Sequence, residues 1–211
     1  MAITAKLFSL VTILFSIFAG LLLYYWMSLS SKEEKKKQLE EVTNFFINFV
    51  IFMWIGKVIM NFSVFIKDPL AVLAYPADST SFYLAIIGSI LRLMYKQKKI
   101  QLAAFLNALL PVVLTASCMF EFIQFLQDLN LYSLTNLIVD TILLAIFYYA
   151  NERVSAFTLF FIILISWLTG TMIMFLTQPY VLFFGYLLSL PFILLFFLFN
   201  ASVLIYIKTK R

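Results

Sequence analysis

Long apolar stretches dominate this chain, and short polar segments separate them. A helix needs about 20 mostly apolar residues to cross the hydrocarbon core of a bilayer. Open sheet edges cannot exist in hydrocarbon, so each stretch is predicted to be a helix. The third stretch is short and is expected to begin in the polar loop at residues 76–80. The predicted fold is all-α, a polytopic membrane protein with seven transmembrane helices at residues 5–28, 43–65, 80–95, 101–127, 131–150, 156–177 and 180–207.

Most basic residues fall between these segments, on one predicted side of the membrane. Twelve of the 15 follow the first helix, join the third to the fourth or the fifth to the sixth, or end the chain: Lys32, Lys35, Lys36, Lys37, Arg92, Lys96, Lys98, Lys99, Arg153, Lys208, Lys210 and Arg211. Loops rich in Lys and Arg are cytoplasmic by the positive-inside rule. We therefore expect the N-terminus outside and the C-terminus in the cytoplasm.

The composition leaves no room for a soluble domain. The chain is 64% hydrophobic and 12% charged, whereas soluble domains are about 45–50% apolar and about 25% charged. The first apolar run, residues 7–26, exceeds the 7–15 residues of a signal-peptide core and is read as a spanning helix. We predict a single integral membrane domain over residues 1–211. Its positive charges lie at helix ends, so no nucleic-acid partner is expected.

The chain offers few of the usual catalytic or metal-binding side chains. It contains no histidine, the commonest general base and metal ligand. Its only cysteine is Cys118, which excludes an intrachain disulfide. We predict no metal site and no cofactor.

Three ionisable residues lie inside apolar segments: Lys57, Glu121 and Asp140. An unpaired charge at the bilayer centre costs about 2.5–3.5 kcal/mol on insertion scales, so they should face the bundle interior. Cys118, Glu121 and Gln124 are three residues apart and form one polar helix face. This pattern fits a polar pocket that opens to the outside and holds a lipid headgroup or a peptide. It fits equally a structural lock, in which Lys57 pairs with one or both acids.

Tyr83 also has two interpretations. It could line that pocket, or it could be an aromatic anchor at the membrane interface. The predicted candidate pocket comprises Lys57, Tyr83, Glu121, Gln124 and Asp140, with no residue assigned as catalytic. Pro111 and Pro191 are expected to kink their helices.

Several segments resemble the prolipoprotein diacylglyceryl transferase family of bacteria. Residues 69–73 read Pro-Leu-Ala-Val-Leu, where the family has Pro-Leu-x-x-Leu. Residues 81–85 read Ser-Phe-Tyr-Leu-Ala, where it has Ser-Phe-His-Gly-Gly. Residues 184–191 read Phe-Gly-Tyr-Leu-Leu-Ser-Leu-Pro, spaced like the family's Met-Gly-Gln-x-Leu-Ser-x-Pro. The resemblance implies seven helices with an external N-terminus.

The residues that matter most in that family are largely replaced here. Tyr83 stands at the position of its essential histidine. The arginine of its Gly-Arg-x-Gly-Asn-Phe motif corresponds to Glu121, and a glutamate on its fifth helix corresponds to Asp140. Residues 169–174 lack both charges of its Gly-Arg-Phe-x-x-Glu pattern, and Thr177 replaces a further arginine. The resemblance therefore covers architecture more than chemistry.

The family moves a diacylglyceryl group from phosphatidylglycerol to the thiol of a lipobox cysteine. That reaction needs cations to hold a phosphodiester, which arginine does best. We expect a non-catalytic relative, a pseudoenzyme linked to lipoprotein biosynthesis, in the bacterial plasma membrane. Its partners would be a phospholipid such as phosphatidylglycerol, a lipoprotein signal segment or another membrane protein. Two alternatives stay open: an active transferase with a rearranged site, and a small transporter or accessory subunit.

Overall fold

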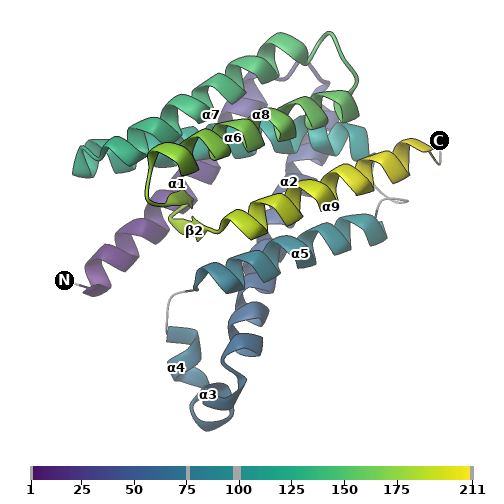
Figure 1. Cartoon of the computed structure of the whole chain (residues 1–211). Helices are drawn as coiled ribbons and strands as arrows, with labels where there is room; N and C mark the ends of the chain where they lie inside the picture. Colours follow the sequence, from purple (N-terminus) through teal and green to yellow (C-terminus); the bar gives the residue numbers. More distant parts are fainter. Residues whose placement is uncertain (1, 75–76, 97–100, 210–211) are drawn as a thin grey trace. The chain divides into compact units, whose positions relative to one another are not determined.

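The computed structural model describes residues 2–74, 77–96 and 101–209. The predicted loop at 76–80 and the basic residues used for orientation fall partly outside these ranges. The described elements, drawn in Figure 1, are α1 (Ala2–Met27), α2 (Lys32–Met60), α3 (Phe62–Lys67), α4 (Pro69–Ala74), α5 (Ser79–Lys96), α6 (Leu102–Asp128), α7 (Leu131–Ala150), α8 (Ala156–Thr177), β1 (Val181–Phe183), β2 (Tyr186–Leu188) and α9 (Leu190–Thr209).

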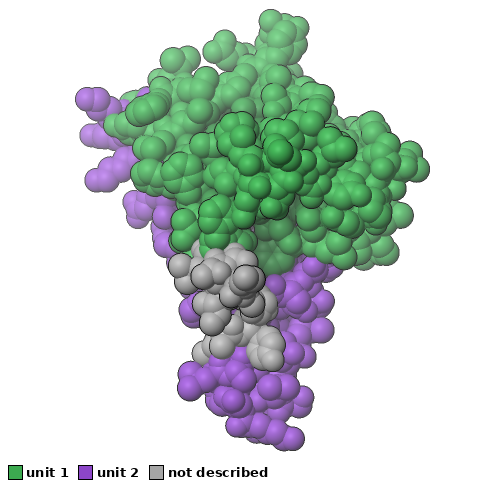
Figure 2. All heavy atoms as spheres, turned by 90° about the vertical axis from the view of Figure 1, so that its left-hand side faces the viewer, with its two compact units in different colours: residues 1–31, 106–211 green, residues 32–105 purple. Residues whose placement is uncertain are grey.

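The chain divides into two compact units, coloured in Figure 2. Unit 1 contains residues 1–31 and 106–211, and unit 2 contains residues 32–105. The single membrane domain over residues 1–211 stays a prediction.

Unit 2 is built on α2 and α5, which pack along each other. A Cβ at Gly56 of α2 would lie 3.2 Å from the Cα and the carbonyl oxygen of Ser81 in α5. A glycine at this crossing lets the two backbones approach closely, as small residues do in membrane helix pairs. Asp78 begins α5 by accepting a hydrogen bond from the Ser81 N–H at 2.9 Å, which satisfies a free donor of the first turn.

Unit 1 has its apolar core between α6, α7 and α8. Leu110 and Leu114 of α6, Leu143 and Phe147 of α7, and Leu159 of α8 belong to one buried apolar cluster. Leu143 and Leu159 are almost completely buried. The three helices therefore form one packed layer of side chains, beside which the polar site described below is placed.

The helices have the length and composition of membrane spans. Among the residues that the structure describes, five helices are long and apolar enough to cross a bilayer: residues 8–27 of α1, and α2, α6, α7 and α8. The described part of α9 is a shorter apolar helix, Leu190–Val203. Large apolar side chains such as Leu14 and Leu195 are exposed, which suits contact with hydrocarbon. These features agree with the predicted all-α membrane class, while the number of seven spans stays a prediction.

The predicted helix at residues 180–207 is wrong at its start. Residues 181–188 form an antiparallel hairpin in which Val181 pairs with Leu188 and Phe183 with Tyr186. Its two-residue turn, Phe184–Gly185, has positive φ at both positions, 49° and 80°, as a type I′ turn requires. The hairpin could not be predicted from the apolar run, because a short apolar segment is equally compatible with a strand and with a helix.

The two prolines behave differently. Pro111 lies inside α6, where it removes one helical hydrogen bond. Pro191 is the second residue of α9, where the N–H has no helical partner in any case. The kink expected at Pro191 therefore has no physical cause.

Candidate functional site: an acidic cavity

Two helices of unit 1 each carry a pair of polar residues four positions apart. On α6 the pair is Ser117 and Glu121, and on α7 it is Asn136 and Asp140. Side chains four residues apart lie on the same face of a helix. Only two residues join α6 to α7, and Asn130 caps α7 by accepting from the Tyr132 N–H at 2.9 Å. This tight connection keeps the helices adjacent, so the two polar faces can meet.

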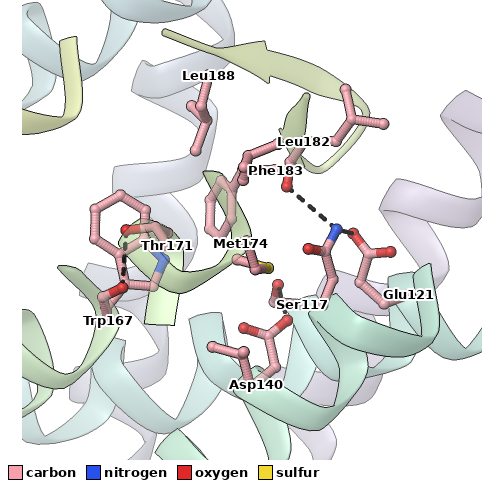
Figure 3. Close-up of a pocket in the computed structure, with 12 residues that line it drawn as sticks. Ser117, Glu121, Asp140, Trp167, Thr171, Met174, Leu182, Phe183 and Leu188 are labelled. Carbon is pink, nitrogen blue, oxygen red and sulfur yellow. Dashed lines mark hydrogen bonds between the residues drawn. The ribbon is translucent and has the colours of Figure 1, made fainter. Parts of the chain in front are cut away.

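Two hydrogen bonds join the polar faces. The Ser117 hydroxyl donates to the Asp140 carboxyl oxygen Oδ2 at 2.5 Å. The Asn136 side-chain Nδ2 donates to Glu121 Oε1 at 3.2 Å. The same Nδ2 lies 3.4 Å from the Leu182 carbonyl oxygen of β1, so the hairpin is attached to the pair (Figure 3). Each acid is thus held by a neutral partner from the neighbouring helix.

All four polar side chains are buried. Glu121 is 3% exposed, Asp140 6% and Asn136 7%. Both acids lie in helices of membrane-spanning length. A charged group inside the hydrocarbon region is costly and usually marks an ion, proton or substrate site.

A small cavity separates these groups from α8 and the hairpin. Its lining comprises Ser117, Glu121, Asn136, Val139, Asp140, Trp167, Thr171, Met174, Val181, Leu182, Phe183 and Leu188. The space open to the centre of a water molecule is about 10 Å³, close to the minimum that holds one water. Figure 3 shows Ser117 and Asp140 pointing toward each other, and the Leu182 carbonyl and the Glu121 carboxyl group on opposite sides of the amide nitrogen that donates to both. The lining contains two carboxyl groups and no basic side chain.

One acceptor in the lining has no partner. A backbone carbonyl can only accept, so the Asn136 amide must turn its nitrogen toward Leu182 and its oxygen elsewhere. That oxygen, Oδ1, is buried and makes no hydrogen bond. A buried polar atom without a partner costs about 1–3 kcal/mol. The cavity is therefore rich in acceptors and short of donors.

The structure places the five predicted pocket residues in different parts of the chain. Glu121 and Asp140 line the cavity, whereas Gln124 lies on α6 outside its lining. Lys57 and Tyr83 belong to unit 2. The structure thus brings two of the five together, and the pairing of Lys57 with either acid stays a prediction.

Within unit 2, Lys57 has an electrostatic interaction that the sequence did not suggest. Lys57 is 6% exposed and interacts with the Asp78 carboxylate. Burial tends to raise the pKa of Asp78, but hydrogen bonds from the hydroxyl and the N–H of Ser81 outweigh it and lower the pKa below its ordinary value. The carboxylate is therefore charged at neutral pH and can serve as a counter-charge for Lys57.

Sequence reasoning missed Ser117, Asn136, Thr171 and Trp167 as members of the site. Small polar residues are common in membrane helices because they can bond to their own backbone, as the Thr171 hydroxyl does to the Trp167 carbonyl at 3.0 Å. The available signal was the repeated spacing of four residues, an amide or hydroxyl followed by an acid. That spacing occurs in both helices and points to one shared face.

The donor set does not suit a transition metal. Among the described residues, no group of three or more His, Cys, Asp or Glu side chains could hold a metal ion. Cys118 is a free, half-buried thiol one position away from the lining residue Ser117.

Comparisons of the chain with protein-family models, with curated proteins and with solved structures find no match.

Proposed function

We propose that this chain is a non-catalytic multi-pass membrane protein, and that the cavity between α6, α7, α8 and the hairpin is its binding site. The ligand of this site is small and either carries positive charge or donates hydrogen bonds. One observation supports the proposal above all others: the lining has two buried carboxyl groups, an unpartnered amide oxygen and no basic side chain.

The proposal keeps the architectural resemblance to the diacylglyceryl transferases. Glu121, Asp140 and Leu188 lie in three separate segments that resemble the family, the last of them residues 184–191, and all three residues line one cavity. Phe120 and Phe184, from two of these segments, pack with their ring centroids 5.4 Å apart. Such clustering of distant segments is what a shared site requires.

The chemistry of this cavity argues against transfer from phosphatidylglycerol. Holding a phosphodiester and its developing charge needs cationic groups, and here two carboxyl groups would repel the phosphate. The cavity also has room for about one water molecule, so a headgroup does not fit. Among the partners considered from the sequence, a phosphatidylglycerol headgroup is therefore the least compatible with this site.

A transfer assay tests the proposal. The full chain in vesicles receives labelled phosphatidylglycerol and a lipobox peptide, alongside an active transferase as positive control. We expect no transfer above background and no rescue of cells depleted of their own transferase. Turnover that is lost in Asp140→Asn but kept in Asp128→Asn would establish an active transferase with a rearranged site. Asp128 is an exposed acid at the end of the neighbouring helix α6, so the two variants make the same chemical change at a buried and an exposed site.

A small ion carrier is a second candidate function. The two acids sit in neighbouring helices of spanning length, which is where proton and ion pathways keep their carboxylates. Uptake of a labelled monovalent cation into protein-containing vesicles separates the two functions. Flux lost in Asp140→Asn supports a carrier, and binding without flux supports a static site.

The proposed topology is seven spans in a bacterial plasma membrane, with the N-terminus outside and the C-terminus in the cytoplasm. The twelve clustered basic residues support it through the positive-inside rule. Reporter fusions after residue 211 and after Asp78 should report the cytoplasm and the exterior, respectively. The same side for both fusions would contradict the orientation.

A further inference from the structure

The acids in the cavity need a counter-charge, and the described lining does not supply one. Glu121 and Asp140 are each at least 94% buried, and their hydrogen-bond partners Asn136 and Ser117 are neutral. Carboxylates in such a medium are held either by protons or by a bound cation. The unpartnered oxygen of Asn136 helps to decide between them.

A proton, a water molecule and a metal cation would satisfy different parts of the site. A proton cancels the charge of one carboxylate. It takes part in one hydrogen bond at most, so it does not provide a partner for all the remaining oxygens of the site. A water molecule donates to Asn136 Oδ1 but brings no charge. A cation meets both needs of the site: it offsets negative charge on the carboxylates, and it attracts the amide and hydroxyl oxygens that have lone pairs to share. Ser117 supports this choice: its hydrogen is directed to Asp140, so its lone pairs are free for a cation.

The size of the cavity and the number of oxygens narrow the choice of cation. Mg²⁺ keeps several water ligands, and the cavity has room for about one water-sized sphere. Ca²⁺ takes about 6–8 oxygen ligands. The lining carries seven side-chain oxygens, on Ser117, Glu121, Asn136, Asp140 and Thr171. Hydrogen bonds already engage Asp140 Oδ2, Glu121 Oε1 and the Thr171 hydroxyl, which leaves too few for Ca²⁺. A single dehydrated monovalent ion of small radius fits best, and a proton on one of the two carboxyl groups balances the remaining negative charge.

We propose that the cavity between α6, α7, α8 and the β1–β2 hairpin is a Na⁺ site, with oxygens from Asp140, Glu121, Asn136 and Ser117 around the ion. The inference rests on the proposed function, since it names the ligand class of that same cavity. It also gives the hairpin a role, because β1 closes the cavity and its Leu182 carbonyl holds the Asn136 amide in the orientation that leaves Oδ1 free.

The experiment uses the full chain in nanodiscs of a zwitterionic lipid, which keeps surface binding of Na⁺ low. Trp167 lines the cavity, whereas Trp26 and Trp54 are exposed. With those two replaced by phenylalanine, the emission of Trp167 is followed as NaCl replaces choline chloride at constant ionic strength. We expect a saturable change with Na⁺, a weaker one with K⁺ and none with choline.

Matched variants connect the signal to the cavity. Asp140→Asn keeps the size of the side chain and an acceptor for Ser117 while it removes the charge, so the protein should fold without Na⁺. Asp140→Asn and Asn136→Leu should each raise the half-saturating Na⁺ concentration by about 10–100-fold, the range seen when groups supporting a metal site are lost. The exposed Asp128→Asn should leave it unchanged. Thermal unfolding gives a second readout, because bound Na⁺ should raise the Tm of the native chain and not that of Asp140→Asn.

Three results would overturn the inference. The first is the absence of a saturable change in Trp167 emission and in Tm when NaCl replaces choline chloride. The second is a saturable response to Ca²⁺ with none to Na⁺. The third is a Na⁺ response that Asp140→Asn leaves intact. The transferase assay is independent of all three, so failure of the Na⁺ site and failure of the non-catalytic function can be told apart.

Discussion

The hydrogen bond between Ser117 and Asp140 reports whether the acid is charged in the folded protein. The perturbation is a double-mutant cycle of Ser117→Ala and Asp140→Leu, in which each single change removes the hydrogen bond. Hydrogen bonds between membrane helices couple by about 0.6 kcal/mol on average and by about 1.7 kcal/mol at most. A hydrogen bond to an ionised group is worth about 1.5–3 kcal/mol. The two ranges barely overlap, so the coupling energy distinguishes a carboxylate from a neutral acid.

The geometry favours the larger value. The Ser117 Oγ to Asp140 Oδ2 distance is 2.5 Å, in the range of about 2.5–2.7 Å for a hydroxyl donating to a carboxylate. Both residues are buried, which reduces screening by solvent. With Na⁺ present, we therefore expect a coupling energy of about 2–3 kcal/mol.

The assay is reversible unfolding of each variant in mixed micelles, with the free energy of unfolding measured in NaCl and in choline chloride. A control cycle pairs Ser117→Ala with the exposed Asp128→Leu and should be additive within about 0.3–0.5 kcal/mol. A coupling for the Ser117–Asp140 pair no larger than the average of about 0.6 kcal/mol for bonds between membrane helices would refute the reasoning. It would mean that the hydroxyl does not hold a charged acid.

Two further predictions concern the packing of helices and the start of α5. A Cβ at Gly20 would lie 2.5 Å from the Val112 carbonyl oxygen, whereas one at Gly88 would meet only the Phe52 side chain at 3.1 Å. Gly20→Ala should therefore destabilise the protein by about 1–3 kcal/mol, and Gly88→Ala should destabilise it by less. Denaturant midpoints measure both effects, and equal effects would contradict the backbone contact at Gly20. The folded-state pKa of Asp78 lies below its ordinary value, so its contribution to stability is complete above the unfolded pKa of about 3.9 and is lost as the pH falls through the lower folded value. Unfolding measured between pH 2 and 6 should show this loss in the native chain and not in Asp78→Asn; a loss that persists in the variant would assign it to another group.

The helices could be predicted from the sequence because the bilayer sets their length. The predicted segments at 131–150 and 156–177 coincide with α7 and α8, and the one at 80–95 differs from α5 by one residue at each end. The predicted segment at 43–65 begins too late, because the charged run from Lys32 to Lys37 already forms the first turns of α2. Exposed charged residues are good helix formers, so apolar length alone underestimates a helix that continues into water.

The hairpin and most of the cavity could not be predicted by the same rule. Residues 181–188 are as apolar as a helix, and only the positive φ angles at Phe184 and Gly185 reveal the turn. Glu121 and Asp140 were predicted because a charge in hydrocarbon is conspicuous. Asn136 and Ser117 were not, because their role depends on which helix faces which, and that is a property of the packed structure. For Lys57, the sequence drew attention to the acids inside apolar segments. The structure instead shows an interaction with Asp78, an acid of the same unit that precedes α5.

Direct binding of radioactive ²²Na⁺ to the purified full chain is the measurement that bears most closely on the acidic cavity. We expect saturation at one ion per chain in the native protein and in Asp128→Asn, with the half-saturating Na⁺ concentration raised about 10–100-fold in Asp140→Asn. Absence of saturable binding to the native chain, or an unchanged half-saturating concentration in Asp140→Asn, would contradict a cation site at these two carboxyl groups.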